Sequence, residues 1–181
     1  KGGRPGARLP PGWTMFLPLV AAAFAAPHLP ALSDDELRRL HEGEVVLRAE
    51  ADGARVTATG IVLVHATPEA TWPAVLDIRA RIPETHTLRA VTEYRRDGAT
   101  RWFVRVDMEV MGVDLKVHNL YTWDPGRNLA TYTLDPEQSN DLLVCDGWYL
   151  TREDPAGTLL VYESVTEAKV YVPAWVRRWH E

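Results

Sequence analysis

Two polar residues interrupt apolar rows of this sequence and are the first candidates for chemistry. Asn119 stands between Val117 and Tyr121 in an alternating strand pattern, so its amide would be buried and would need a hydrogen-bond partner. That partner is Tyr132 across the sheet, a water or the carbonyl group of a bound molecule. If Asp146 shares the face of Trp148, an apolar environment would raise the pKa of its carboxyl group and suit it to acid or base catalysis. Otherwise, it caps a local bend.

Other catalytic and metal-binding motifs are missing from the sequence. The six histidines lack the spacing of two ligands one helical turn apart, and a single cysteine, Cys145, excludes a cysteine-based metal cluster. The sequence has no glycine-rich phosphate-binding loop, since Gly60, Gly98, Gly112, Gly126 and Gly147 are isolated. No serine has the Gly-x-Ser-x-Gly context of a nucleophile. Glu163 is a weaker candidate, because the expected register turns it away from Trp148. We therefore predict no metal, no cofactor and no catalytic residue.

The composition indicates one globular domain with an aromatic-rich interior. The chain has 181 residues, 46% of them hydrophobic, which suffices for a core. Its net charge of −5, without blocks of like charge, argues against nucleic-acid binding and against a polybasic membrane patch. Seven tryptophans and six tyrosines either fill the core or line a cavity for a bulky apolar ligand.

Residues 1–26 have the composition of an export signal. Basic residues precede an apolar run over 15–26, and Ala23-Phe24-Ala25 matches a signal-peptidase site. The run is too short to span a bilayer. Met15 is an alternative initiator, and an Ala/Pro-rich leader without a targeting role is the other alternative. We expect cleavage near Ala25 or Ala26 and a periplasmic or secreted protein with no integral membrane segment in its mature chain.

Two helices and a hairpin are predicted ahead of the main strands. Within the N-terminal segment 27–43, Ser33 and Glu36 form a capping box for a helix over 34–42. Strands over 44–50 and 55–65 are joined by a turn at Asp52-Gly53. Thr67, followed by proline, then caps a second helix.

The later turns predict which strand residues lie opposite one another. A tight turn after Val110 would pair Val106 with Val117 and Asp107 with Lys116. The inward row of the first strand is then apolar: it consists of Trp102, Val104, Val106 and Met108.

Two further turns set the register of the remaining strands. A four-residue turn over 124–127 would place Tyr121 opposite Ala130 and Asn119 opposite Tyr132. A longer loop over 153–157 would place Trp148 opposite Tyr162.

Three stretches of this sequence, in this order, resemble the SRPBCC or START-like helix-grip superfamily. They are Ala66-x-Pro68-Glu69-x-x-Trp72, Asp146-Gly147-Trp148-Tyr149-Leu150 and Val172-Pro173-x-Trp175. The resemblance implies an α+β fold over 44–181, in which a curved antiparallel sheet of about seven strands wraps around a long C-terminal helix. It also implies short helices after the first strand and an apolar cavity. The chain ends two turns into the expected C-terminal helix, so we expect a longer chain to be more stable and to bind better.

We therefore predict a domain that binds or transports a hydrophobic small molecule such as a lipid, quinone, sterol or polyketide-like compound. The predicted ligand-binding residues face inward: they are Trp102, Val104, Val106, Met108, Asn119, Tyr121, Tyr132, Trp148 and Tyr162. A polyketide cyclase or dehydratase using the same cavity is the alternative. A lipid-transfer protein with transient membrane contact is a third, for which the outward pair Phe103 and Leu120 gives slight support.

Overall fold

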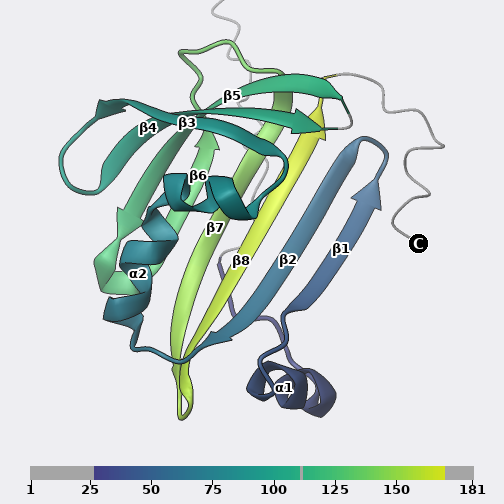
Figure 1. The fold of residues 1–181 in the computed structure, drawn as a ribbon, viewed down its shortest axis with the longest axis vertical. Coiled ribbons are helices and arrows are strands. Elements are labelled where there is room, and N and C mark those ends of the chain that lie inside the picture. The colour runs from purple at the N-terminus through teal and green to yellow at the C-terminus, as the bar shows by residue number, and fades with distance from the viewer. Residues whose placement is uncertain (1–26, 111, 170–181) are drawn as a thin grey trace, which may run out of the picture.

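The protein consists mainly of one antiparallel sheet with short helices on both sides (Figure 1). The structure is a computed structural model that describes residues 27–110 and 112–169. The predicted export leader over 1–26 and the predicted C-terminal helix after Val172 lie outside the described residues. The elements in chain order are α1 (Asp34–His41), β1 (Val46–Asp52), β2 (Arg55–Val64), α2 (Pro68–Leu76), the 3-10 helix η1 (Ile78–Glu84), β3 (Leu88–Arg96), β4 (Arg101–Val110), β5 (Val113–Asp124), the 3-10 turn η2 (Pro125–Arg127), β6 (Leu129–Leu134), β7 (Leu142–Asp154) and β8 (Gly157–Ala168).

The eight strands are ordered β1-β2-β8-β7-β6-β5-β4-β3, so β1 and β3 form the edges. This is one strand more than the expected seven. Strand β3 was not singled out in the sequence, because irregular pairing after Leu88 and after Glu93 breaks its alternation. None of the described helices has the length and apolar character that a membrane crossing requires.

The sheet is strongly curved, and its two faces carry different helices. Figure 1 shows β3, β4 and β5 turning across the end of the longer strands, with α2 in front of the sheet and α1 at its foot. Neighbouring residues of β8 show the alternation: Val161 packs with Leu40 of α1, whereas Leu160 packs with Trp72 of α2. We call the face that carries α2 and η1 the inner face, and the face that carries α1 the outer face.

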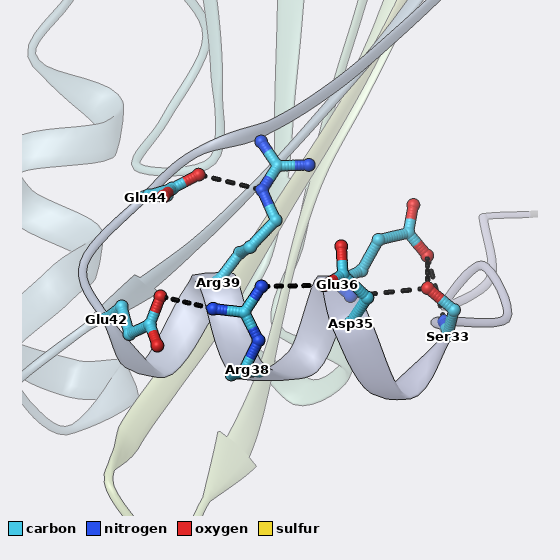
Figure 2. A network of polar contacts seen from close by, with 7 residues as sticks. All are labelled: Ser33, Asp35, Glu36, Arg38, Arg39, Glu42 and Glu44. Atoms are coloured by element: carbon cyan, nitrogen blue, oxygen red, sulfur yellow. Dashed lines mark hydrogen bonds and ion pairs between the residues drawn. The ribbon is translucent and has the colours of Figure 1, made fainter.

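Helix α1 forms where its capping signals predicted. The Ser33 hydroxyl accepts a hydrogen bond from the Glu36 backbone N–H, and the Glu36 carboxylate accepts one from the Ser33 backbone N–H at 2.8 Å (Figure 2). Further along the helix, Arg38 contacts two carboxylates, those of Asp35 and Glu42. The helix then buries Leu40 completely against the outer face, which anchors it to the sheet.

The predicted register of β4 and β5 is confirmed. Val106 lies opposite Val117, and Asp107 lies opposite Lys116. The apolar side of this hairpin faces inward, where Trp102 is 5% exposed. The same register turns Phe103 outward, but Phe103 is only 1% exposed and lies beneath the Arg95 guanidinium, so the predicted outward pair with Leu120 does not form an exposed patch.

Two other predicted registers were wrong. In β5 and β6, Tyr121 lies opposite Tyr132 rather than opposite Ala130, because the turn extends to Asn128, which adopts a left-handed backbone conformation. This shift of two residues keeps every side chain on its predicted face. In β7 and β8 the turn is tighter than expected and pairs Asp154 with Gly157. The resulting shift is one residue, which exchanges the two faces of one strand relative to its partner.

Candidate ligand-binding face

Five aromatic side chains, one from each of five consecutive strands, form a continuous row across the inner face. Ring centroids are 5.6 Å apart between Trp102 and Tyr121, and 5.3 Å apart between Tyr121 and Tyr132. They are 6.0 Å apart between Tyr132 and Tyr149, and again between Tyr149 and Tyr162. These separations are those of favourable aromatic pairs. The row runs from buried rings at Trp102 and Tyr121 to half-buried rings at Tyr149 and Tyr162.

Two glycines make room for this row. Gly147 lies opposite Tyr132, and a Cβ added to Gly147 would meet the Tyr132 ring and the Glu163 carbonyl oxygen, both at 2.4 Å. Gly60 lies opposite Tyr162, and a Cβ there would come within 2.1 Å of that ring. Each of the two rings therefore lies over the backbone of the next strand, a position that a side chain at either glycine would block.

Helix η1 places a cationic side chain over the row. The Arg81 guanidinium donates from Nη1 to the Tyr149 hydroxyl at 2.6 Å and from Nη2 to the Val75 carbonyl at 2.5 Å. Its Cζ lies 4.9 Å from the centroid of the Tyr149 ring. Burial is the largest single influence and lowers the pKa of Arg81, but the neighbouring Tyr149, Tyr121 and Tyr132 together raise this pKa above its usual value.

Three tyrosines of the row remain protonated across the physiological pH range. Burial is the largest cause that raises the pKa of Tyr121, Tyr132 and Tyr162 above the usual value, and the neighbouring Tyr149 raises it further. A hydrogen bond to Ser164 acts in the opposite direction on Tyr132. The inner face therefore presents neutral hydroxyl groups and one guanidinium around Tyr149.

Three buried polar groups at the inner face have no hydrogen-bond partner among the described residues. They are the Asn119 side-chain oxygen, the Trp72 indole N–H and the Thr151 hydroxyl, each on a residue no more than 5% exposed. The Asn119 side chain does form a hydrogen bond with Cys145 across the sheet, which lowers the pKa of that thiol against the larger effect of burial. Unpaired buried polar groups are uncommon and costly, so they mark a surface that a bound molecule could complete.

A cavity of about 520 Å³ opens between η1 and strands β3 and β4. Its floor includes Trp102 and Val104, two of the predicted ligand-binding residues. Apolar side chains from the helices and β3 complete the lining together with four charged residues: Leu76, Ile78 and Val91, with Asp77, Arg79, Glu93 and Arg96. The volume is within the range of small-molecule sites in proteins.

Eight of the nine predicted ligand-binding residues face inward. They are Trp102, Val104, Val106, Met108, Asn119, Tyr121, Tyr132 and Tyr162. Trp148 is the exception, since it packs on the outer face with Leu40 and Val161 and donates its indole N–H to Glu163 at 3.3 Å. The one-residue register error in β7 and β8 caused this misplacement. That error also hid the proximity of Glu163 to Trp148.

Asp146 does share the face of Trp148, but this is the outer face. Its carboxylate accepts a hydrogen bond from the Thr133 hydroxyl at 2.5 Å. It therefore does not lie in the predicted apolar pocket, and it is not available as an acid or base at the inner face. No group of three potential metal ligands occurs within residues 27–110 and 112–169.

Two residues of the inner face were missed in the sequence. Assuming a tighter turn between β7 and β8 would have identified Tyr149, since the observed register pairs it directly with Tyr162. Arg81 lies in an irregular helical segment between two prolines, so no periodicity indicates its direction. Only the packing of η1 on the inner face brings Arg81 to Tyr149.

Comparison with solved structures identifies the fold. A STAR-related lipid transfer protein from Xanthomonas axonopodis superposes with a TM-score of 0.59 at 13% identity, covering 73% of this chain and 80% of that one. A START superfamily protein from Mycobacterium smegmatis gives a TM-score of 0.53 at 19% identity, with 67% and 83% covered. The Zhui aromatase/cyclase from Streptomyces gives a TM-score of 0.55 at 17% identity, covering 64% of this chain and 70% of that one.

These similarities show that the chain has a START-like fold, as its sequence resemblance predicted. At these identities they establish the fold alone. No model of a protein family matches the sequence, and no curated protein matches it.

Proposed function

We propose that this protein binds an apolar small molecule, such as a lipid, quinone, sterol or polyketide-like compound, against the inner face of its sheet. The observation that carries this proposal is the aromatic row, which is continuous over five strands and only half-buried at Tyr149 and Tyr162. Covering such rings contributes about 25 cal/mol for each Å² of apolar surface removed from water. Transport rather than chemical change of the ligand is the role that this surface favours.

The fold and the cavity support this proposal. The fold is shared with a protein named for lipid transfer. In addition, the cavity beside η1 is lined by Trp102 and Val104, at the buried end of the row. The unpaired Asn119 oxygen offers an acceptor to a hydroxyl group of the ligand.

A cyclase or dehydratase activity is the second candidate. Arg81 and the Tyr149 hydroxyl lie together over the inner face and could polarise a ligand carbonyl. An aromatase/cyclase with this fold makes the comparison relevant. However, the carboxylate expected to move protons, Asp146, lies on the outer face with Thr133. Binding without turnover is therefore the better-supported function.

We further propose that the protein acts after export, because of the signal-like composition of residues 1–26. Sequencing the N-terminus of the mature protein tests this. A start near residue 26 supports export, whereas an intact cytosolic chain contradicts it.

The binding proposal is tested by native mass spectrometry of the protein purified from its host, followed by extraction of any apolar molecule, and by titration with the neutral dye N-phenyl-1-naphthylamine. Replacing both Tyr149 and Tyr162 by Ala should weaken dye binding about thirtyfold, since each ring contributes on the order of 1 kcal/mol beyond its area. Leu143→Ala is the matched control, because Leu143 also lies on β7 and is 55% exposed. An unoccupied protein that does not bind the dye, or equal losses in both variants, would contradict the proposal.

A further inference from the structure

Arg81 is a charged group above a surface that is otherwise uncharged. The inward-facing positions of four strands carry apolar, hydroxyl, amide or thiol groups and no charged side chain: these positions lie in 115–123 of β5, 130–134 of β6, 145–151 of β7 and 160–168 of β8. The guanidinium forms two hydrogen bonds, both to neutral oxygen atoms, those of Tyr149 and Val75. Among the described side chains, its positive charge is thus solvated by dipoles.

Other arginines of the described residues differ from Arg81 in having a carboxylate partner. Arginines on the outer face and at the strand edges reach a carboxylate: Arg38, Arg48, Arg95 and Arg105 each have one within 2.9 Å. No carboxylate lies within 4.0 Å of Arg81 among the side chains that the structure describes, which are those of residues 27–83, 85–110 and 112–169. A partly buried charge without a counter-ion is costly, and an anion brought to it would be held more strongly than at an exposed site.

The guanidinium has donors to spare for such an anion. It has more N–H groups than its two contacts use, and they are arranged in a planar fork that matches a carboxylate. The Tyr149 hydroxyl, 2.6 Å from Nη1, adds a second polar group at the same place. One guanidinium balances one negative charge, which suits a carboxylate rather than a doubly charged phosphate.

We propose that the ligand of this protein is an amphipathic monoanion, whose carboxylate binds Arg81 beside Tyr149 while its apolar body lies along the aromatic row. This inference rests on the proposed function and specifies the chemical class of its ligand. Charge-assisted hydrogen bonds to a partly desolvated arginine are roughly twice as strong as neutral ones. The carboxylate should therefore determine which apolar molecules bind tightly.

The test compares two probes that share one apolar body, pyrenedodecanoic acid and its methyl ester, in fluorescence titrations of the full chain at about pH 8, where the acid is ionised. The wild-type protein should bind the acid at least tenfold more tightly than the ester. Arg81→Met should remove this preference and leave the affinity for the ester within about threefold. Arg81→Lys keeps the charge but loses the fork, and should retain part of the preference.

Arg79→Met is the matched control, because Arg79 is an exposed arginine of the same helix, two residues away. It should leave the preference intact. If Arg79→Met removes the preference, the anion lies at the cavity beside η1 and the assignment to Arg81 is wrong. Thermal melts followed by circular dichroism verify folding. If Arg81→Met does not fold, Arg81→Lys provides the test. An unchanged preference of Arg81→Lys for the acid over the ester would overturn the proposal that the planar guanidinium binds the carboxylate.

The two proposals fail in distinguishable ways. Equal affinity of the wild-type protein for acid and ester overturns the carboxylate site but leaves apolar binding in place. Absence of binding for both probes contradicts the proposed function and this inference together.

Discussion

The two faces of the sheet treat buried polar groups in opposite ways. On the outer face, such groups are paired within the protein: Asp135 accepts a hydrogen bond from the Tyr94 hydroxyl at 2.6 Å, and Trp148 donates to Glu163 at 3.3 Å. On the inner face, the Asn119 oxygen has no partner among the described residues, and the two described hydrogen bonds of Arg81 go to neutral oxygen atoms. Within residues 27–110 and 112–169, the buried polar groups of the outer face are therefore paired, whereas several of those at the inner face are not.

Unpartnered nitrogen atoms on the outer side do not weaken this comparison. They are the Nε atoms of arginines whose guanidinium groups already approach a carboxylate: Arg55, Arg95 and Arg105. The neutral groups without partners belong instead to the inner face or to α2, which covers it. Unsatisfied groups of this kind are often retained at functional surfaces despite their cost.

The largest expected effect concerns the outer face. Trp148→Ala should lower the free energy of unfolding by about 3 to 5 kcal/mol, because it opens a cavity in a cluster that also holds Leu40 and Val161. Tyr149→Phe, at the adjacent residue on the inner face, keeps the ring and removes the hydroxyl that accepts a hydrogen bond from Arg81, so it should cost less, about 1.5 kcal/mol. Urea unfolding followed by circular dichroism measures both. Equal losses would break the distinction between the two faces.

The registers of the hairpins explain how far the sequence could predict this molecule. Between β4 and β5, only one register is compatible with the tight turn and also places all apolar residues of β4 on one face. Val106 and Val117 were therefore correctly predicted to lie opposite each other. In β7 and β8, apolar residues occupy both faces, and Trp148 or Tyr149 could equally face inward. Hydrophobic patterning cannot distinguish those alternatives, because it does not reveal that Gly147 is needed beneath Tyr132.

The second prediction compares two buried asparagines. The Asn140 side chain is fully used, since its oxygen accepts from the His118 backbone N–H at 2.6 Å and its amide donates to two carbonyls. Asn140→Leu should therefore cost about 1 to 3 kcal/mol of unfolding free energy. Asn119→Leu removes an oxygen without a partner together with the weak hydrogen bond to the Cys145 thiol, and should change the unfolding free energy by less than about 1 kcal/mol.

Chemical denaturation of both asparagine variants tests the contrast, and dye titration adds a second measurement. Asn119→Leu should retain the stability of the protein while altering the affinity for ligands that carry a hydroxyl group. A loss of stability as large as that of Asn140→Leu would show that Asn119 serves the fold rather than a ligand.

The expected effect that is smallest at neutral pH concerns Cys145, which lies on the inner face and is 7% exposed. Burial raises the pKa of its thiol from 9 to about 11. The unfolded chain therefore loses this proton at a lower pH than the folded chain, and the free energy of unfolding falls as the pH rises from about 9 to about 11. Cys145→Ala should flatten this part of the stability profile. An identical slope in the variant would assign the decline to other groups.

The candidate site was predictable where strand alternation determined it and unpredictable where a helix contributed. Tyr121, Tyr132 and Asn119 kept their faces even though their register was two residues in error, because an even shift preserves alternation. Arg81 could not be placed, since it depends on how η1 packs over Tyr149. The most specific feature of the site therefore comes from tertiary structure alone.

The rings that lie over glycines also have a mechanical consequence. Tyr132 extends from β6 over Gly147 of β7, and Tyr162 extends from β8 over Gly60 of β2, so each ring covers the backbone of the neighbouring strand. Sliding one strand along its neighbour would first require the ring to lift out of its place. A pulling force on the sheet would therefore be shared by β6, β7, β8 and β2, and these strands should yield together rather than peel away one at a time.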